Sequence, residues 1–312
     1  MNAHPAPLAS ADVSVIVVSY NTRSLLEACL RSLLEQTPSL QLDVIVVDNA
    51  SRDGSADAVR GAFPHVRLIA NLENVGFAAA SNQGIRASTG AYLLLLNPDT
   101  VVLDRAVERL VDYLEHHPDV GACGPRLCFP DGTYQRSAYP WPSIVGALYE
   151  YSALFRRLPA LAPAWGDHPE VSRPVGYCSG ACLLVRRCCL EAVGPLDEGY
   201  RMYGEDVDWC TRMWRCGWPV HYVREASVVH HLGAATGDAA MRRLKELRGK
   251  LHYLAKWHGP AYVAAYRLAV LLCGLYRYGR WRLRPSGDGT AERADHLALY
   301  RGLVRLSLGR AA

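Results

Sequence analysis

The sequence lacks the glycine-rich motifs with which many α/β proteins bind nucleotides. The dinucleotide fingerprint Gly-x-Gly-x-x-Gly does not follow the first apolar segment, and the phosphate-binding Gly-x-x-x-x-Gly-Lys-Ser/Thr is also absent. Nicotinamide oxidoreductases and P-loop ATPases are therefore disfavoured. A nucleotidyltransferase is disfavoured too, because it would carry a basic, glycine-rich loop after that segment.

Paired cysteines and a secretory leader are missing as well. None of the ten cysteines forms a Cys-x-x-Cys pair, so we expect reduced, mostly buried thiols in a cytosolic protein. The spacing of Cys178 and Cys182 does not match the usual structural zinc clusters, which disfavours a zinc site. Residues 1–12 have neither a basic start nor an apolar core, so no signal peptide is predicted.

The composition is that of a soluble enzyme of ordinary charge. With 312 residues, 50% of them hydrophobic and 21% charged, the chain can form one large domain with an appendage, or two modest domains. The net charge of +4 predicts no binding to nucleic acid.

The first half of the sequence alternates between strand and helix patterns. Apolar, β-branched segments at 13–20, 43–48, 66–69 and 92–96 are typical of buried strands, and leucines at helical spacing follow the first of them. A helix of small residues is expected over 78–89. Short connections between such elements predict a mostly parallel α/β sheet covered by helices on both faces.

Polar side chains stand where the predicted strands end. Tyr20 and Asn21 follow the first strand, Asp48 and Asn49 the second, and Asp99 the fourth. Ligands of parallel α/β sheets bind at this edge, and amides and carboxylates there suit a base and a ribose. Asp99 would hold Mg²⁺ or Mn²⁺ against a diphosphate. Simple turns after the strands are the alternative for Asp48 and Asn49.

A second acidic cluster begins a helix predicted over 205–216. Glu205, Asp206 and Asp208 lie in its first turn, and Gly217 ends it. A carboxylate there can serve as a general base, although favourable interaction with the helix dipole would also explain it.

Seven short motifs in order resemble the family 2 glycosyltransferases, which are inverting enzymes with the GT-A fold. The resemblance runs from residue 13 to about residue 233. Its motifs are residues 15–21, 46–55, 74–77 with Asn82, 96–99, 178–181, 204–208 and 229–230. The Asn97-Pro98-Asp99 form in place of Asp-x-Asp is similar to a branch of rhamnosyl and related transferases.

The resemblance implies a role for each matching residue. The residues implied to bind the nucleotide sugar are Tyr20, Asn21, Asp48, Asn49, Ser51, Asp53, Asn74, Gly76, Asn82 and Asn97. Asp99 and His230 would bind the metal, with His231 as an alternative register. Asp206 would be the base.

On the acceptor side, the resemblance implies Glu205, Gly180 and Ala181. Asp208 lies on another face of the predicted helix, where we expect it to hold the surrounding loop. Trp209, one turn from Asp206, would form a platform for the acceptor or belong to the core.

The remaining segments are compositionally distinct. Residues 127–174 are rich in Pro, Tyr and Trp, which suits either an acceptor-side loop or an irregular connector. Residues 241–284 carry eleven Lys and Arg and one acid, Glu246. The apolar run 261–275 contains Arg267 and is shorter than the ~20 residues of a spanning helix. A basic helix on an anionic membrane face and a solvated helical bundle are the two interpretations.

We therefore expect a catalytic domain over 11–235, a basic helical region over 236–284, and a linker with a short helix over 285–312. The nucleotide-sugar half of the catalytic domain would span about 11–125, and the acceptor half about 126–235. The expected function is transfer of a sugar from a dTDP- or UDP-linked donor to a glycan or lipid-linked acceptor, in the cytoplasm at the inner face of the cell membrane. The alternative is a catalytically inactive nucleotide-sugar binder or scaffold.

Overall fold

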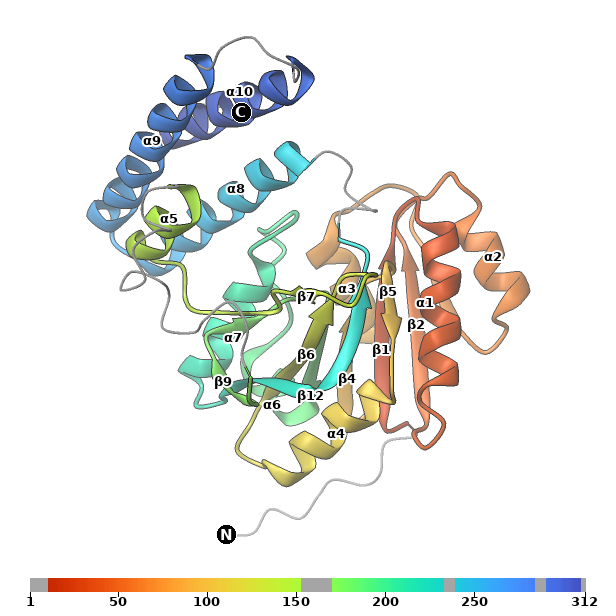
Figure 1. The fold of residues 1–312 in the computed structure, drawn as a ribbon. Coiled ribbons are helices and arrows are strands. Elements are labelled where there is room, and N and C mark those ends of the chain that lie inside the picture. The colour runs from red at the N-terminus through yellow and green to blue at the C-terminus, as the bar shows by residue number, and fades with distance from the viewer. Residues whose placement is uncertain (1–10, 153–169, 233–238, 284–289, 310–312) are drawn as a thin grey trace. The chain divides into compact units, whose positions relative to one another are not determined.

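The computed structural model describes residues 11–152, 170–232, 239–283 and 290–309, which form two compact units (Figure 1). Of the described residues, the first unit comprises 11–139, 170–201 and 205–232, and the second comprises 140–152, 202–204, 239–283 and 290–309. The α/β sheet lies in the first unit, and the regular elements described in the second unit are helices.

The first half of the sheet is parallel, as predicted. Its strands are β1 (Val13–Ser19), β2 (Leu42–Asp48), β3 (Arg67–Ala70) and β4 (Tyr92–Leu96), in the order β3-β2-β1-β4. Every residue of β1 is buried, because helices cover both faces of the sheet. The connecting helices are α1 (Arg23–Glu35), α2 (Ser55–Ala62) and α3 (Phe77–Ala87).

The second half adds antiparallel strands that the sequence pattern did not predict. In chain order the further elements of this unit are β5 (Thr100–Val102), α4 (Ala106–His116), β6 (Ala122–Cys128), β7 (Tyr134–Gln135), β8 (Ala138–Tyr139), β9 (Arg173–Val175), β10 (Tyr177–Cys178), β11 (Cys182–Arg186), α6 (Arg187–Val193), α7 (Glu205–Arg215) and β12 (Val220–His230). Strand β11 runs antiparallel between β4 and β6, and β12 is parallel to β6.

This topology brings distant segments to one edge of the sheet. Strand β6 is antiparallel to β11, which is antiparallel to β4, so β6 and its parallel neighbour β12 run in the direction of β4. The end of β12 at His230 therefore lies at the same edge as the ends of β1, β2 and β4. The start of β11 lies there too, since Cys182 pairs with Leu96.

The two faces of the sheet have separate cores. Val15 and Val17 of β1 belong to the cluster that buries α1 and α4, including Leu30 and Leu110. Ile16 points to the other face, where α3 packs so closely that a Cβ on Gly84 would lie 2.5 Å from the Ile16 Cγ2 atom. The glycine is what permits this approach.

The second unit is built from α5 (Ile144–Tyr151), α8 (Ala239–Trp257), α9 (Pro260–Arg282) and α10 (Thr290–Ser307), with α10 packed on α8 and α9. We expected only a linker with a short helix over residues 285–312. Helix α10 instead begins at Thr290 and has 18 residues. Within the described parts of the chain, no helix is long and apolar enough to span a bilayer.

The thiols are all free, and most are buried in the core as predicted. Cys188 and Cys216 are exceptions, because both are exposed. Cys178 and Cys182 are buried separately and belong to no cluster of three His, Cys, Asp or Glu residues among the residues described.

The contact between α3 and β1 predicts opposite effects for two helical glycines. Gly84→Ala forces a methyl group into Ile16 and should lower the free energy of unfolding by about 1–3 kcal/mol. Gly61→Ala, in α2 with nothing within 4 Å of the new Cβ, should raise it by roughly 0.5–1 kcal/mol. Urea unfolding measures both changes, and a stabilising Gly84→Ala would contradict the packing.

Candidate active site

The loops after β1 and β2 are joined by hydrogen bonds between the predicted nucleotide-binding residues. The Asn21 backbone N–H donates to Ser51 Oγ at 2.9 Å, and the Arg52 N–H donates to Asn21 Oδ1 at 2.7 Å. Asn21 and Ala50 both have positive φ, of 53° and 65°. The two strand ends thus form one preorganised surface, on which Tyr20 is about half exposed.

Asp48 is buried at this surface with half of its carboxylate unused. Its Oδ2 accepts from the Ser51 N–H at 3.0 Å, whereas Oδ1 has no hydrogen-bond partner. A buried carboxylate oxygen without a partner costs free energy, so its presence favours a ligand that donates to it.

A network of amides continues from Asn49 to the segment before α3. The Asn49 side chain donates to Asn74 Oδ1 at 3.1 Å and accepts from the Val75 N–H at 3.1 Å. Gly76 has a φ of 90°, and a Cβ there would lie 3.0 Å from the Arg201 carbonyl oxygen. Asn74 and Gly76 therefore lie beside Asn49, and their role in binding a nucleotide sugar stays a prediction.

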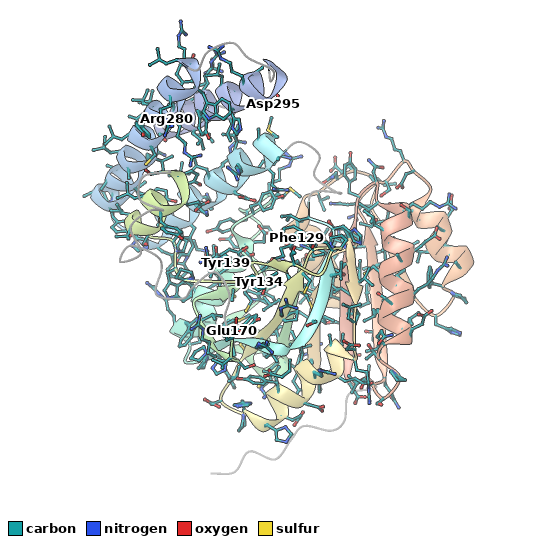
Figure 2. The ribbon with its side chains drawn as sticks, in the orientation of Figure 1. Phe129, Tyr134, Tyr139, Glu170, Arg280 and Asp295 are labelled. Carbon is teal, nitrogen blue, oxygen red and sulfur yellow. The ribbon has the colours of Figure 1, made fainter. Side chains whose placement is uncertain are left out.

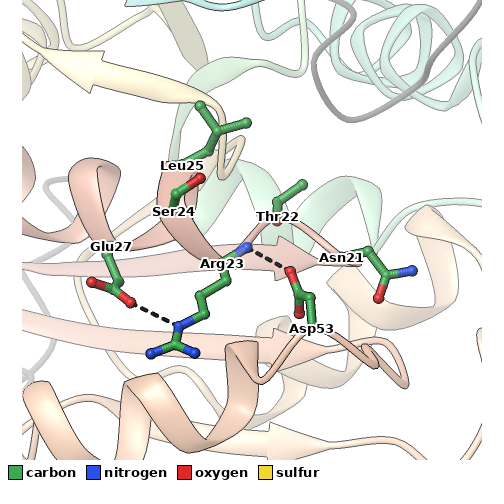
Figure 3. Close-up of a pocket in the computed structure, with 7 residues that line it drawn as sticks. All are labelled: Asn21, Thr22, Arg23, Ser24, Leu25, Glu27 and Asp53. Carbon is green, nitrogen blue, oxygen red and sulfur yellow. Dashed lines mark hydrogen bonds and ion pairs between the residues drawn. The ribbon is translucent and has the colours of Figure 1, made fainter.

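A cavity of about 490 Å³ opens at the start of α1 (Figure 3). Its lining residues are Asn21, Thr22, Arg23, Ser24, Leu25, Glu27 and Asp53. The predicted site residue Asp53 acts here as a cap, because its Oδ2 accepts from the first N–H of α1 and its Oδ1 from the Ser55 N–H of α2. Burial raises the pKa of Asp53, but the bonds from Ser55 and Arg23 outweigh it and hold the pKa below its usual value.

Asp99 and His230 meet at the ends of β4 and β12. The His230 Nε2 atom lies 3.3 Å from Asp99 Oδ1, which is buried and makes no hydrogen bond. Asn97 Nδ2 lies 3.5 Å from the same nitrogen. The predicted metal residues are thus brought together, whereas the alternative residue His231 contributes its backbone N–H to the Asp99 carbonyl.

This pair fits a divalent cation by its donor chemistry. An unpartnered carboxylate oxygen beside an imidazole nitrogen offers one oxygen and one nitrogen ligand, and substrate phosphates and water usually complete the shell of Mg²⁺ or Mn²⁺. The described residues contain no third His, Cys, Asp or Glu in the group.

Asp206 faces the loop before β11. The Gly180 N–H donates to Asp206 Oδ2 at 3.2 Å, and a Cβ on Gly180 would lie 3.6 Å from the Asp206 Cβ. Next along the loop, the Ala181 carbonyl accepts from the Asn97 N–H at 2.9 Å. One short segment therefore connects the carboxylate of α7 to the end of β4, where Asn97 lies.

Glu205 is a buried acid next to Asp206. Its Oε2 has no hydrogen-bond partner. Burial, reinforced by the neighbouring Asp206, raises the pKa of Glu205 to about 8. At neutral pH Glu205 is therefore mainly protonated, and its protonation reduces the charge of the acidic cluster.

Three residues that the sequence placed near the site are buried and bonded to other residues of the protein. Trp209 is fully buried, and its Nε1–H donates to the Gly194 carbonyl at 2.9 Å, so it belongs to the core and cannot form an acceptor platform. Asn82 is buried and bonded to the backbone of Leu196, and its place in the pocket wall stays a prediction. Asp208 is buried and paired with Arg212 at 3.1 Å.

Arg212 and Asn82 together hold residues 193–196, at the end of α6 and just after it. Arg212 donates to the carbonyls of Val193 and Pro195, while the Asn82 amide binds both backbone groups of Leu196 from α3. Asp208 pairs with the Arg212 side chain that makes these bonds, and its supporting role in the site stays a prediction.

Gln135 is a contact of the site that the sequence did not indicate. Its Oε1 lies 2.6 Å from His230 Nδ1, and its Nε2 donates to the His230 carbonyl at 3.1 Å. It lies in the Pro- and Tyr-rich stretch, on β7 with Tyr134, and Tyr139 follows on β8 (Figure 2). That stretch has no periodicity from which its direction could be predicted.

The arrangement of this fold is that of a GT-A glycosyltransferase. The mannosyltransferase PcManGT from Pyrobaculum calidifontis, solved with GDP-Man and Mn²⁺, matches with a TM-score of 0.58 over 98% of this chain and 88% of that one, at 20% identity. The family model described as glycosyl transferase family 2 matches residues 14–180, so the chain belongs to this family of glycosyltransferases. The predicted fold and family are thereby confirmed.

Two relatives extend the similarity beyond the family model. The N-acetylglucosaminyl-diphospho-decaprenol L-rhamnosyltransferase of Mycobacterium tuberculosis is 32% identical, covering 95% of this chain and 94% of that protein. The O-antigen biosynthesis protein RfbC of Myxococcus xanthus is 30% identical over 85% of this chain, but only over 21% of its own length.

The raised pKa of Glu205 predicts a pH-dependent stability. Unfolded Glu ionises near 4.5 and the folded residue near 8, so the folded state alone keeps the proton between these values and wild-type stability falls as the pH rises. Glu205→Gln removes this loss. Its urea midpoint should exceed that of the wild type by more at pH 8 than at pH 5.

The exposed Glu73→Gln is the control and should show no such difference between the two pH values. An advantage of Glu205→Gln that is equal at pH 5 and pH 8 would contradict the raised pKa.

Proposed function

We propose that this enzyme transfers a rhamnosyl group from a nucleoside-diphosphate donor, dTDP- or UDP-linked, to a hydroxyl of a lipid-linked diphosphate glycan with inversion at the anomeric carbon. The observation that carries the proposal is the bond between the Asn97 N–H and the Ala181 carbonyl, which joins the Asp99–His230 pair to the Asp206 segment at one sheet edge. The rhamnosyltransferase from M. tuberculosis, similar over nearly the whole chain, supports the donor and acceptor classes.

The donor nucleoside would bind across the ends of β1 and β2. The free Oδ1 of Asp48 is suited to accept from a base N–H or a ribose hydroxyl. Tyr20, about half exposed directly after β1, would contact the base. Asn49 is fully committed to Asn74 and the backbone of Val75, so it would shape the pocket without contacting the base directly.

Asp99 and His230 would hold a divalent ion against the donor diphosphate. When bound, such an ion stabilises the negative charge of the leaving nucleoside diphosphate. PcManGT, which has a similar fold, was solved with Mn²⁺ and GDP-Man, and this supports the assignment.

Asp206 would act as the general base. The acceptor hydroxyl oxygen forms a bond to the anomeric carbon as the bond from that carbon to the diphosphate oxygen breaks, and the hydroxyl proton passes to Asp206. The Gly180 N–H would orient the carboxylate. Glu205 holds its own proton at neutral pH, so it would donate a hydrogen bond on the acceptor side while Asp206 accepts.

The second unit would contact the inner face of the cell membrane, where a lipid-linked acceptor lies. Helix α9 exposes Leu268, Leu272, Leu275 and Tyr276 at helical spacing, each about half accessible. Arg280 lies one turn further, 5.9 Å from the Tyr276 ring (Figure 2), and Arg282 follows. An apolar stripe beside exposed arginines suits the surface of an anionic bilayer.

The catalytic assignment predicts a selective loss in Asp206→Asn. With dTDP-rhamnose and a polyprenyl-diphospho-N-acetylglucosamine acceptor, kcat should fall roughly 10²–10⁴-fold because the amide accepts no proton. Thermal stabilisation of the protein by the donor should remain, since the nucleoside site is intact. Radiolabelled sugar transfer and a thermal-shift titration measure the two quantities.

The matched control is the exposed Asp57→Asn, which should transfer at the wild-type rate. Unchanged turnover in Asp206→Asn would refute the base. A wild-type protein that is stabilised by the donor yet transfers nothing would support the inactive binder. Stabilisation by only one of the dTDP- and UDP-linked sugars would decide between the two nucleotides.

The membrane contact predicts a loss of vesicle binding when the stripe is charged. The double change Leu268→Glu and Leu272→Glu should weaken co-sedimentation with phosphatidylglycerol-containing vesicles by about tenfold or more, because each leucine loses burial and each new acid is repelled. Leu34→Glu, an exposed leucine on α1, should bind as the wild type does. Equal binding of the double variant and the wild type would refute the surface.

A further inference from the structure

We propose that Gln135 is a positioning residue that fixes the tautomer of His230 and so makes its Nε2 atom available to a divalent cation. The inference rests on the proposed function, because that function needs the cation at Asp99. It adds a residue from β7, outside every motif of the resemblance, to the metal site.

The two bonds between Gln135 and His230 determine where the imidazole hydrogen lies. The Gln135 Nε2 atom is 3.1 Å from the His230 carbonyl oxygen, which can only accept, so the amide must place its NH₂ group there. Its Oε1 atom then faces His230 Nδ1 at 2.6 Å, which requires a hydrogen on Nδ1. Both residues are buried, so water offers little competition for either bond.

The neutral ring that carries hydrogen on Nδ1 presents a lone pair at Nε2. That lone pair is directed toward the neighbourhood of Asp99 Oδ1, 3.3 Å away, which is itself buried and without a hydrogen bond. A lone pair and a carboxylate oxygen repel each other unless a cation lies against both. Asn97 Nδ2, at 3.5 Å from Nε2, is the one amide hydrogen donor that the described residues bring to this nitrogen.

The alternative arrangement, in which both nitrogens of His230 carry a hydrogen, has different consequences. An imidazolium with hydrogens on both nitrogens would form an ion pair with Asp99 and would exclude a metal. Gln135 would then stabilise the fold and have no effect on metal affinity. The wider pattern in metalloproteins favours the first arrangement, because a ligating histidine commonly donates its second N–H to a fixed acceptor.

The test is a titration of the full-length protein with Mn²⁺ in the presence of dTDP. Calorimetry and the electron paramagnetic resonance signal of free Mn²⁺ both measure the binding. Gln135→Met keeps the length of the side chain but accepts no hydrogen bond from Nδ1, and should weaken Mn²⁺ binding roughly 10–100-fold. Gln135→Glu still accepts from Nδ1 and should bind Mn²⁺ at least as tightly as the wild type. Gln36→Leu, at the end of α1, is the control.

A double-mutant cycle separates positioning from stability. In a His230→Ala background Gln135→Met should change the Mn²⁺ affinity less than twofold, because the nitrogen that it positions is gone. Equal losses in both backgrounds, or wild-type Mn²⁺ affinity in Gln135→Met, would overturn the inference. If Gln135→Met does not fold, weakened Mn²⁺ binding by Gln135→Glu would overturn it.

Failure of the inference can be told apart from failure of the proposed function. Sugar transfer by the wild type, measured on the same preparation with and without a chelator, tests the reaction itself. Transfer that resists the chelator, with no Mn²⁺ binding, would remove the cation and the role of Gln135 but leave the transferase. If Mn²⁺ binding follows the expected order of variants but the wild type transfers no sugar, the role of Gln135 would be supported and the proposed transferase activity would be rejected.

Discussion

The antiparallel pairing of β11 with β4 is the constraint on which the candidate site depends. The pairing continues past the strand ends into the bond from the Asn97 N–H to the Ala181 carbonyl. Asn97 and Asp99 lie on one side of that bond, and Gly180 with its contact to Asp206 on the other. A shift of one residue in this register would turn alternate side chains to the other face and separate the two carboxylates.

The same edge collects polar groups that the fold leaves incompletely bonded. One oxygen each of Asp48, Asp99 and Glu205 is buried without a hydrogen bond. Each such group costs the folded state about 1–3 kcal/mol. Unbonded hydroxyl groups are buried elsewhere too, for example in Thr37 and Tyr222. Among the described residues, however, these three are the only buried carboxylate oxygens without a hydrogen bond, and all three belong to predicted site residues. A ligand that binds at this edge could satisfy them.

Much of the edge could be predicted because it depends on local pattern. The strand ends at Ser19 and Asp48 follow from β-branched runs, and parallel strands place their ends together. Trp209 could not be placed, since a tryptophan near the start of a helix can face the core or the solvent. Gln135 could not be found at all, because its contact with His230 spans 95 residues and β7 has only two residues.

The adjacent acids Glu205 and Asp206 illustrate how one helix turn yields two different groups. Glu205 lies on the buried face of α7, where desolvation favours its neutral form, and its neighbour's charge adds to the same effect. Asp206 is partly accessible and accepts from Gly180 and Val207, bonds that suit a carboxylate. The helix N-terminus favours a negative charge on both, but burial differs between them. The difference in burial, and not the distance from the helix start, therefore makes Glu205 the acid that keeps its proton at neutral pH.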